Sequence, residues 1–98
     1  MNSLIDVFKA EVPESQAERL LELREVALPE LRQRCPGLLR AELVRLDATT
    51  WLDLLEWRDA QAAEDAAAHF GAIPELIEMH ELIGEPERHE RGEVLHCA

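Results

Sequence analysis

The sequence predicts an α+β fold of the ferredoxin-like type, with the element order β-α-β-β-α-β and both helices on one face of a four-stranded antiparallel sheet. Alternating apolar residues, typical of half-buried strands, occur over 4–12, 38–46 and 50–58. Apolar residues at three- and four-residue steps follow the first and third of these segments and indicate amphipathic helices. The chain has 98 residues without a linker or an internal repeat, so one domain over 1–98 is expected.

The first helix is expected to begin directly after Pro13, which ends the first strand. Its apolar stripe continues to Cys35, and Pro36-Gly37 stops it. Pro29 lies inside the stripe, and a proline removes a helix hydrogen bond and clashes with the preceding turn. We therefore expect the helix to kink at Pro29 or to split after Leu28.

A short connection joins the second and third strands into a hairpin. Asp59 then provides an N-cap for an alanine-rich helix that extends to Phe70. Pro74 is well placed to begin a further helical segment, which ends at Gly84. After a polar stretch, we expect a last short strand at Val94–Cys97.

The third strand carries the most informative pattern in the chain. Because side chains alternate along a strand, Trp51, Asp53, Leu55 and Trp57 point to the same face. Two indoles with a carboxylate between them are suited to a pocket for a flat or aromatic molecule. The alternative is that both tryptophans pack in the core, as strand aromatics commonly do. Phe70 would either line such a pocket or fill it.

Composition and charge exclude several function classes. The formal net charge of −11 argues against nucleic acid and against an anionic membrane surface, because both require basic residues. No apolar run approaches the roughly 20 residues of a membrane-spanning helix, and the N-terminal segment lacks the features of a signal peptide. Two cysteines, Cys35 and Cys97, are too few for a disulfide framework. We therefore expect a reduced, cytoplasmic protein.

Several turns and packing segments match the pattern of a known family. Pro36-Gly37 leads from the first helix into a strand, and Thr50-Trp51 opens the next strand after a short turn. Glu56-Trp57-Arg58-Asp59 leads into the alanine-rich stretch 60–68, with Asp59 in place of the serine that is common at this helix start. On these residues, nearly the whole chain resembles the antibiotic biosynthesis monooxygenase-like group of dimeric α+β barrels.

The resemblance implies a homodimer in which two four-stranded sheets meet face to face, with a pocket between sheet and helices in each subunit. Apolar side chains on the open face of the sheet support this expectation, because such a surface normally marks an interface. The family includes cofactor-independent oxygenases of polyketide-like phenols, quinol-type oxygenases and haem-degrading enzymes. Fold alone does not choose among these activities.

The first hypothesis from the resemblance is a cofactor-independent monooxygenase acting on a small aromatic, quinol or polyketide-like substrate, without a metal. In such enzymes an asparagine, a tryptophan and other polar groups hold the phenolate that reacts with oxygen. Trp57 matches the strand tryptophan, but Asn2 is the only asparagine and tyrosine is absent. A histidine would have to act as the base, so His80 and His69 are the candidate catalytic residues, together with Arg58.

Two alternatives remain open. The first is a non-catalytic dimeric module that binds a small hydrophobic ligand or serves in assembly. Convergence of a histidine with Arg58 or Arg45 on a cavity beside Trp57 would favour the enzyme, and a cavity filled by leucine and alanine would favour this module. The second is haem binding or degradation, in which His80 would ligate the iron, although the first-strand asparagine and second tryptophan of haem-degrading relatives are missing.

Overall fold

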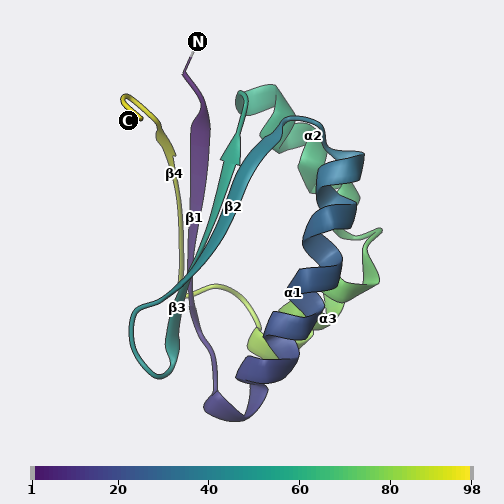
Figure 1. The fold of residues 1–98 in the computed structure, drawn as a ribbon, viewed down its shortest axis with the longest axis vertical. Helices are drawn as coiled ribbons and strands as arrows, with labels where there is room; N and C mark the ends of the chain where they lie inside the picture. Colours follow the sequence, from purple (N-terminus) through teal and green to yellow (C-terminus); the bar gives the residue numbers. More distant parts are fainter. Residues whose placement is uncertain (1, 98) are drawn as a thin grey trace.

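The computed structural model describes residues 2–97, which form a four-stranded sheet with three helices packed on one of its faces (Figure 1). The strands lie in the order β2-β3-β1-β4, and all neighbouring strands are antiparallel. This arrangement confirms the predicted ferredoxin-like fold class. The elements are β1 (Leu4–Glu11), α1 (Glu14–Arg34), β2 (Leu38–Arg45), β3 (Thr50–Trp57), α2 (Ala60–Phe70), α3 (Pro74–Ile83) and β4 (Arg88–Glu93).

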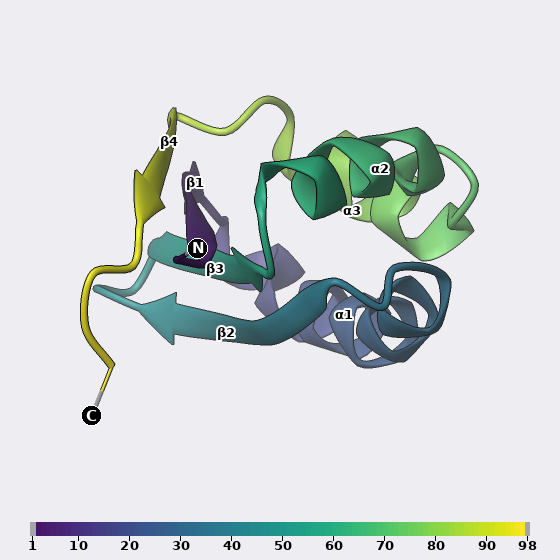
Figure 2. The ribbon, with the colours of Figure 1, turned by 90° about the horizontal axis from the view of Figure 1, so that it is seen from above.

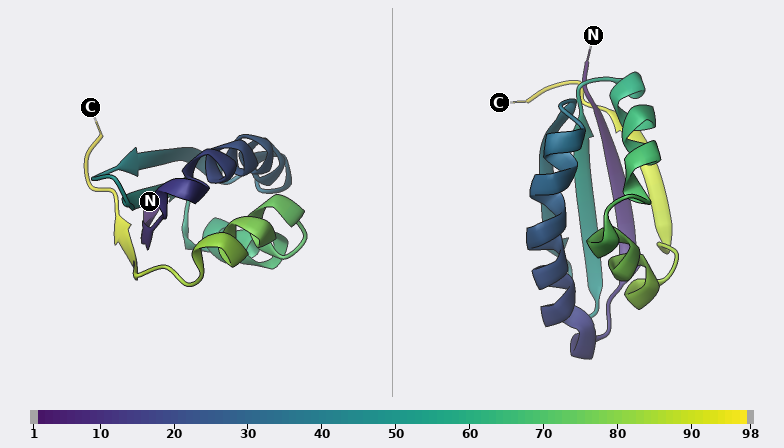
Figure 3. Two further views of the ribbon diagram at one scale, coloured as in Figure 1. Left: turned by 90° about the horizontal axis from the view of Figure 1, so that it is seen from below. Right: turned by 90° about the vertical axis from the view of Figure 1, so that its right-hand side faces the viewer.

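The helices and the sheet enclose the core on one side only. Viewed from above, all three helices lie on the same side of the sheet (Figure 2). The helix α1 lies toward β2, while α2 and α3 lie toward β4 (Figure 3). The opposite face of the sheet has no covering element among residues 2–97, and the apolar side chains of Ile5, Val7 and Leu54 on it are only half buried.

The helix α1 runs without a break through Pro29, so of the two expected outcomes, a kink or a split after Leu28, the split does not occur. The reason is the position of the proline on the solvent side of the helix. Both Pro29 and Glu25, whose carbonyl would otherwise accept the missing hydrogen bond, are exposed. Water can satisfy that carbonyl, and the buried stripe that contains Ala27 and Leu31 continues on the other side.

The last strand lies at Arg88–Glu93 and not at Val94–Cys97, so that prediction was wrong as well. All six residues of β4 are exposed, and their sequence, RHERGE, has no apolar alternation from which a strand is inferred. The strand forms because its backbone pairs with β1 at the edge of the sheet, in a register that sets Asp6 opposite Arg91. Tertiary pairing here overrides local propensity.

The end of β3 that carries Trp57 packs closely against α2. Asp59 caps α2 as predicted, because its carboxylate accepts a hydrogen bond of 2.8 Å from the backbone N–H of Ala62. Gly37 lies so near this helix that a Cβ atom built on it would be 2.4 Å from the Cβ of Ala62. The glycine therefore permits a close approach of backbone and helix that a larger residue would block.

Candidate active site

A cavity of about 490 Å³ lies between the helix-facing side of the sheet and the helices α1 and α3. Its wall is mostly apolar and includes side chains from every element except β4, such as Phe8 of β1, Leu43 of β2 and Met79 of α3. No residue of α3 is buried, although this helix forms one side of the cavity. An apolar cavity of this size with a small number of polar groups is typical of a site for a small organic molecule.

The charged pair Arg24–Asp53 is the main polar feature of the cavity wall. Asp53 projects from β3 and Arg24 from α1, and Nη1 of Arg24 donates to Oδ1 and Oδ2 of Asp53 at 2.8 and 2.7 Å. The arginine side chain is only 11 % exposed. Burial raises the pKa of the Asp53 carboxyl above its usual value, and the Arg24 guanidinium opposes this shift only in part. Asp53 is therefore a better proton acceptor than an ordinary aspartate.

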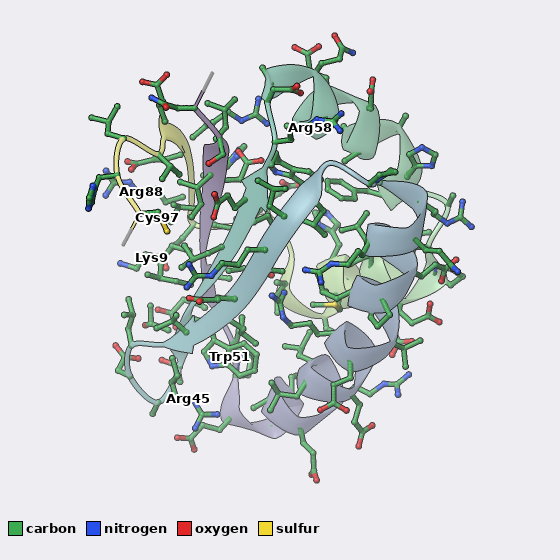
Figure 4. All side chains as sticks on the ribbon, turned by 45° about the horizontal axis from the view of Figure 1, so that its top comes forward. Lys9, Arg45, Trp51, Arg58, Arg88 and Cys97 are labelled. Atoms are coloured by element: carbon green, nitrogen blue, oxygen red, sulfur yellow. The ribbon has the colours of Figure 1, made fainter. Side chains whose placement is uncertain are left out.

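Trp51 lies two residues before Asp53 on the same face of β3 and also lines the cavity. Its side chain is buried, and the guanidinium carbon of Arg45 lies 5.7 Å from the centre of its ring (Figure 4). This contact is a cation–π interaction across the β2–β3 pair. The indole Nε1 is the one buried side-chain nitrogen or oxygen in residues 2–97 without a hydrogen-bond partner.

Trp57 does not line the cavity, in contrast to the pocket role expected from the sequence. It is almost completely buried, and its Nε1 donates a hydrogen bond of 2.9 Å to Asp6. Asp6 also contacts Arg91 at 2.8 Å and His89 at 3.0 Å, and the His89 ring stacks on Phe8. Burial alone would raise the pKa of Asp6, but hydrogen bonds from Arg91, His89 and Trp57 outweigh it and lower this pKa. The second tryptophan thus belongs to a structural cluster that attaches β4.

The three predicted catalytic residues have different surroundings, and one of them, His80, lines the cavity. His80 is on the cavity wall, but it is exposed, and its Nε2 is 3.2 Å from the carboxylate of Glu85. His69 is half buried in the last turn of α2 and is not part of the wall. Arg58 is exposed beside Asp59, and it lies near the opposite end of the sheet from Trp51 (Figure 4). Neither Arg58 nor Arg45 lines the cavity, so the convergence with a histidine beside Trp57 that would favour the enzyme is not found.

The remaining predicted pocket residues, Trp51, Asp53 and Phe70, all contribute to the wall. The arginine in the cavity is Arg24, which was not among the site residues predicted from the sequence. A signal was present, because Arg24 occupies the apolar stripe of α1 between Leu20 and Leu31. A charged residue at a core-facing helix position needs a partner, and the acidic residue on the tryptophan face of β3 was available to provide it.

Two features are absent from the described part of the chain. Within residues 2–97, no three histidine, cysteine, aspartate or glutamate side chains lie close enough together to hold a metal ion. None of the helices in this range is both long enough and apolar enough to cross a membrane.

The sequence profile of the antibiotic biosynthesis monooxygenase family matches residues 3–75, about three quarters of the chain. The chain belongs to this family. The matched region contains β1, α1, the β2–β3 hairpin and α2, and it therefore includes Arg24, Trp51 and Asp53. No protein of curated function matches the sequence.

Solved structures show the same fold at low sequence identity. SnoaB, a cofactor-independent oxygenase from Streptomyces nogalater, is 18 % identical with a TM-score of 0.66, over 100 % of this chain and 96 % of its own. MupZ from Pseudomonas fluorescens is 18 % identical with a TM-score of 0.78, over 93 % of this chain and 71 % of its own. A dimeric ferredoxin-like protein from an uncultured marine organism is 12 % identical with a TM-score of 0.78, over 100 % and 92 % of the two chains.

Proposed function

We propose that this member of the family is a cofactor-independent monooxygenase that oxidises a small aromatic, quinol or polyketide-like substrate in the cavity beside Trp51. The observation that carries the proposal is the Arg24–Asp53 pair, which places a carboxylate of raised pKa and a nearly buried guanidinium on an otherwise apolar wall. Membership of the family and the shared fold with the oxygenase SnoaB support the same reaction class.

The chemistry assigns one role to each member of the pair. Asp53 takes a proton from an activated C–H or O–H group of the substrate, and Arg24 stabilises the negative charge that remains on the substrate oxygen. The electron-rich anion reduces dioxygen itself, and the peroxide formed at the ring carbon takes the proton back from Asp53 to give a hydroperoxide. Loss of water from this hydroperoxide leaves a carbonyl, so that one CH₂ group and O₂ become C=O and H₂O. The apolar wall excludes bulk water from the anion.

Oxygen consumption with a panel of anthrones, quinols and catechols tests the proposal. We expect uptake by the wild-type protein, and a decrease of about 100-fold or more in Asp53→Asn, because general-base catalysis contributes about that factor. Asp65→Asn on the exposed surface of α2 is the matched control and should keep the wild-type rate. His80→Gln examines the base predicted from the sequence, which lies on the same cavity wall.

The outcomes separate the hypotheses. If His80→Gln abolishes uptake and Asp53→Asn does not, the histidine is the base and the role of Asp53 given above is wrong. If the folded wild-type protein consumes no oxygen with any member of the panel, the oxygenase proposal fails in favour of a non-catalytic module for small-ligand binding or assembly.

We further propose that two copies pair through the open face of the sheet. The support is the row of half-buried apolar side chains on this face, including Ile5, Val7 and Leu54, and the fold shared with a dimeric ferredoxin-like protein. Sedimentation velocity at micromolar concentration should give a dimer for the wild type and a monomer for Leu54→Glu. A monomeric wild type would contradict the pairing.

A further inference from the structure

The cavity wall formed by residues 2–97 contains one sulfur-bearing side chain, that of Met79. This residue projects from α3 and is half buried. Neither cysteine belongs to the wall, since Cys35 is buried at the end of α1 and Cys97 is exposed. A thioether is polarisable and is oxidised to a sulfoxide, whereas the aliphatic side chains around it resist oxidation. An oxidant in this cavity therefore meets a single thioether.

Met79 lies at the end of the cavity where the proposed chemistry takes place. It packs against a buried cluster that contains Trp51, together with Ala10, Val12 and Leu20. Trp51 precedes Asp53 by two residues on the same face of β3, and alternate residues of a strand are about 7 Å apart. A hydroperoxide formed beside Asp53 is thus confined with the thioether in one small cavity, and confinement favours reaction over escape.

The attachment of α3 makes the position of Met79 sensitive to a change in polarity. No residue of α3 is buried, and the ion pair from Glu78 to Arg19 of α1 is largely exposed. The helix is therefore held mainly by half-buried apolar side chains, including Leu76, Met79 and Ile83. A sulfoxide is polar, and its oxygen without a partner in this apolar contact is unfavourable.

We propose that Met79 is an oxidation site that regulates the cavity: an organic hydroperoxide bound there transfers one oxygen atom to the thioether, and the sulfoxide loosens α3. In this step the O–O bond breaks and a sulfur–oxygen bond forms. The sulfur loses two electrons, and the hydroperoxide gains them and becomes the alcohol, which retains the proton. The inference rests on the proposed function in one respect, since the proposed reaction supplies such a hydroperoxide.

Added cumene hydroperoxide tests the site without any turnover. This oxidant is apolar and aromatic, whereas hydrogen peroxide is polar and has no preference for an apolar cavity. Met1 is the only other methionine in the sequence and serves as an internal reference. Mass spectrometry of the peptides that contain Met1 and Met79 gives the ratio of their oxidation rates.

In the folded protein, the ratio of Met79 to Met1 oxidation should be about tenfold higher with cumene hydroperoxide than with hydrogen peroxide, because binding raises the local concentration of the oxidant. In urea the two oxidants should give the same ratio. The corresponding alcohol, 2-phenyl-2-propanol, should compete for the cavity and protect Met79 but not Met1. Equal ratios in the folded protein, or no protection of Met79 by the alcohol, would overturn the proposal.

Met79→Leu nearly conserves the side-chain volume and tests the effect on α3. Treatment with cumene hydroperoxide should lower the midpoint of thermal unfolding of the wild type by about 5 °C, and it should leave that of Met79→Leu unchanged. An equal decrease in both proteins, or no decrease in fully oxidised wild type, would contradict the regulatory role. The oxidant is added in all of these measurements, so they are independent of oxygen uptake and the two proposals can fail separately.

Discussion

Two places on the helix-facing side of the sheet each contain an aspartate and a tryptophan, Asp6 with Trp57 and Asp53 with Trp51. Their surroundings are opposite. Asp6 receives hydrogen bonds from Trp57, Arg91 and His89, and its pKa is lowered. Asp53 has Arg24 as its one charged partner, and its pKa is raised. The first site is closed and fully bonded, whereas the second borders a cavity and leaves the N–H of Trp51 unpaired.

The difference separates a structural site from a site that is ready for a ligand. A carboxylate that is fully satisfied within the protein gains nothing from a new partner, so the Asp6 cluster is suited to holding β4 in place. A carboxylate of raised pKa on a cavity wall is arranged to interact with a molecule that enters. Burial of a tryptophan on this face therefore does not by itself indicate function, and a position on the cavity wall is the distinguishing observation.

The largest expected effect comes from removing the acceptor at the closed site. Asp6→Ala should lower the free energy of unfolding by about 3 kcal/mol, because it leaves the buried Trp57 N–H unpaired and removes the ionic attachment of β4. Chemical denaturation measures this loss. Asp6→Asn retains an acceptor oxygen and should lose less, and an Asp6→Ala variant as stable as the wild type would contradict the structural role.

The packing at the Trp57 end of β3 predicts a somewhat smaller loss. Gly37→Ala should destabilise the protein by about 2 kcal/mol, because its Cβ would lie 2.4 Å from that of Ala62 and α2 would have to shift. Gly71→Ala is the matched control, since a Cβ atom at Gly71 would meet nothing within 4 Å. Thermal unfolding of both variants provides the comparison, and equal midpoints would show that α2 moves without cost.

The two aspartates should affect the pH dependence of stability with opposite signs. Asp6, whose folded pKa is lowered, contributes stability above its unfolded pKa near 3.8, and this is lost as pH falls through the folded value. Asp53, whose folded pKa is raised, costs stability at neutral pH, and this cost disappears as pH falls through its folded value.

Unfolding free energies measured between pH 3 and pH 7 test these signs. Compared with the wild type, Asp6→Asn should show a weaker loss of stability toward acid, and Asp53→Asn should show a steeper one. If both variants change the profile in the same direction, the two carboxylates do not differ as described.

The smallest effect on stability is expected from an exposed ion pair that joins the helices α1 and α3. Arg19 of α1 makes two hydrogen bonds to Glu78 of α3, at 2.9 and 3.0 Å, but both side chains are largely exposed. Arg19→Gln should therefore lower the midpoint of thermal unfolding by less than about 2 °C, and high salt should remove the difference. A larger shift that persists at high salt would indicate that this pair fixes α3 over the cavity.

The sequence predicted the elements that have either a regular apolar pattern or a clear start signal. The strand alternation of 50–58, the cap at Asp59 and the helix that begins at Pro74 all correspond to observed elements. Strand β4 was misplaced because its six residues are exposed and are specified by pairing with β1 and not by their own pattern. The split at Pro29 does not occur because a helix tolerates a proline on its solvent side, and the sequence alone did not show which side of α1 faces solvent.

The candidate site was predictable only in part, because contacts between residues far apart in the sequence depend on tertiary packing. Periodicity gave the face of β3 that carries Trp51 and Asp53, and both residues line the cavity. Periodicity could not show that the indole N–H of Trp57 donates a hydrogen bond to Asp6, which precedes it by 51 residues in the sequence. Nor could it pair Arg24 with Asp53, because such contacts depend on how α1 crosses the sheet.

The charged composition of β4 has a further consequence for the behaviour of the protein at high concentration. An edge strand with free N–H and C=O groups invites strands of other molecules to add to it, which is a common route to aggregation. Here the outer edge displays Arg88, Glu90 and Glu93, and the other edge strand, β2, carries Arg40 and Glu42. Burying these charges against another strand would be costly, so both edges resist the growth of a continuous intermolecular sheet.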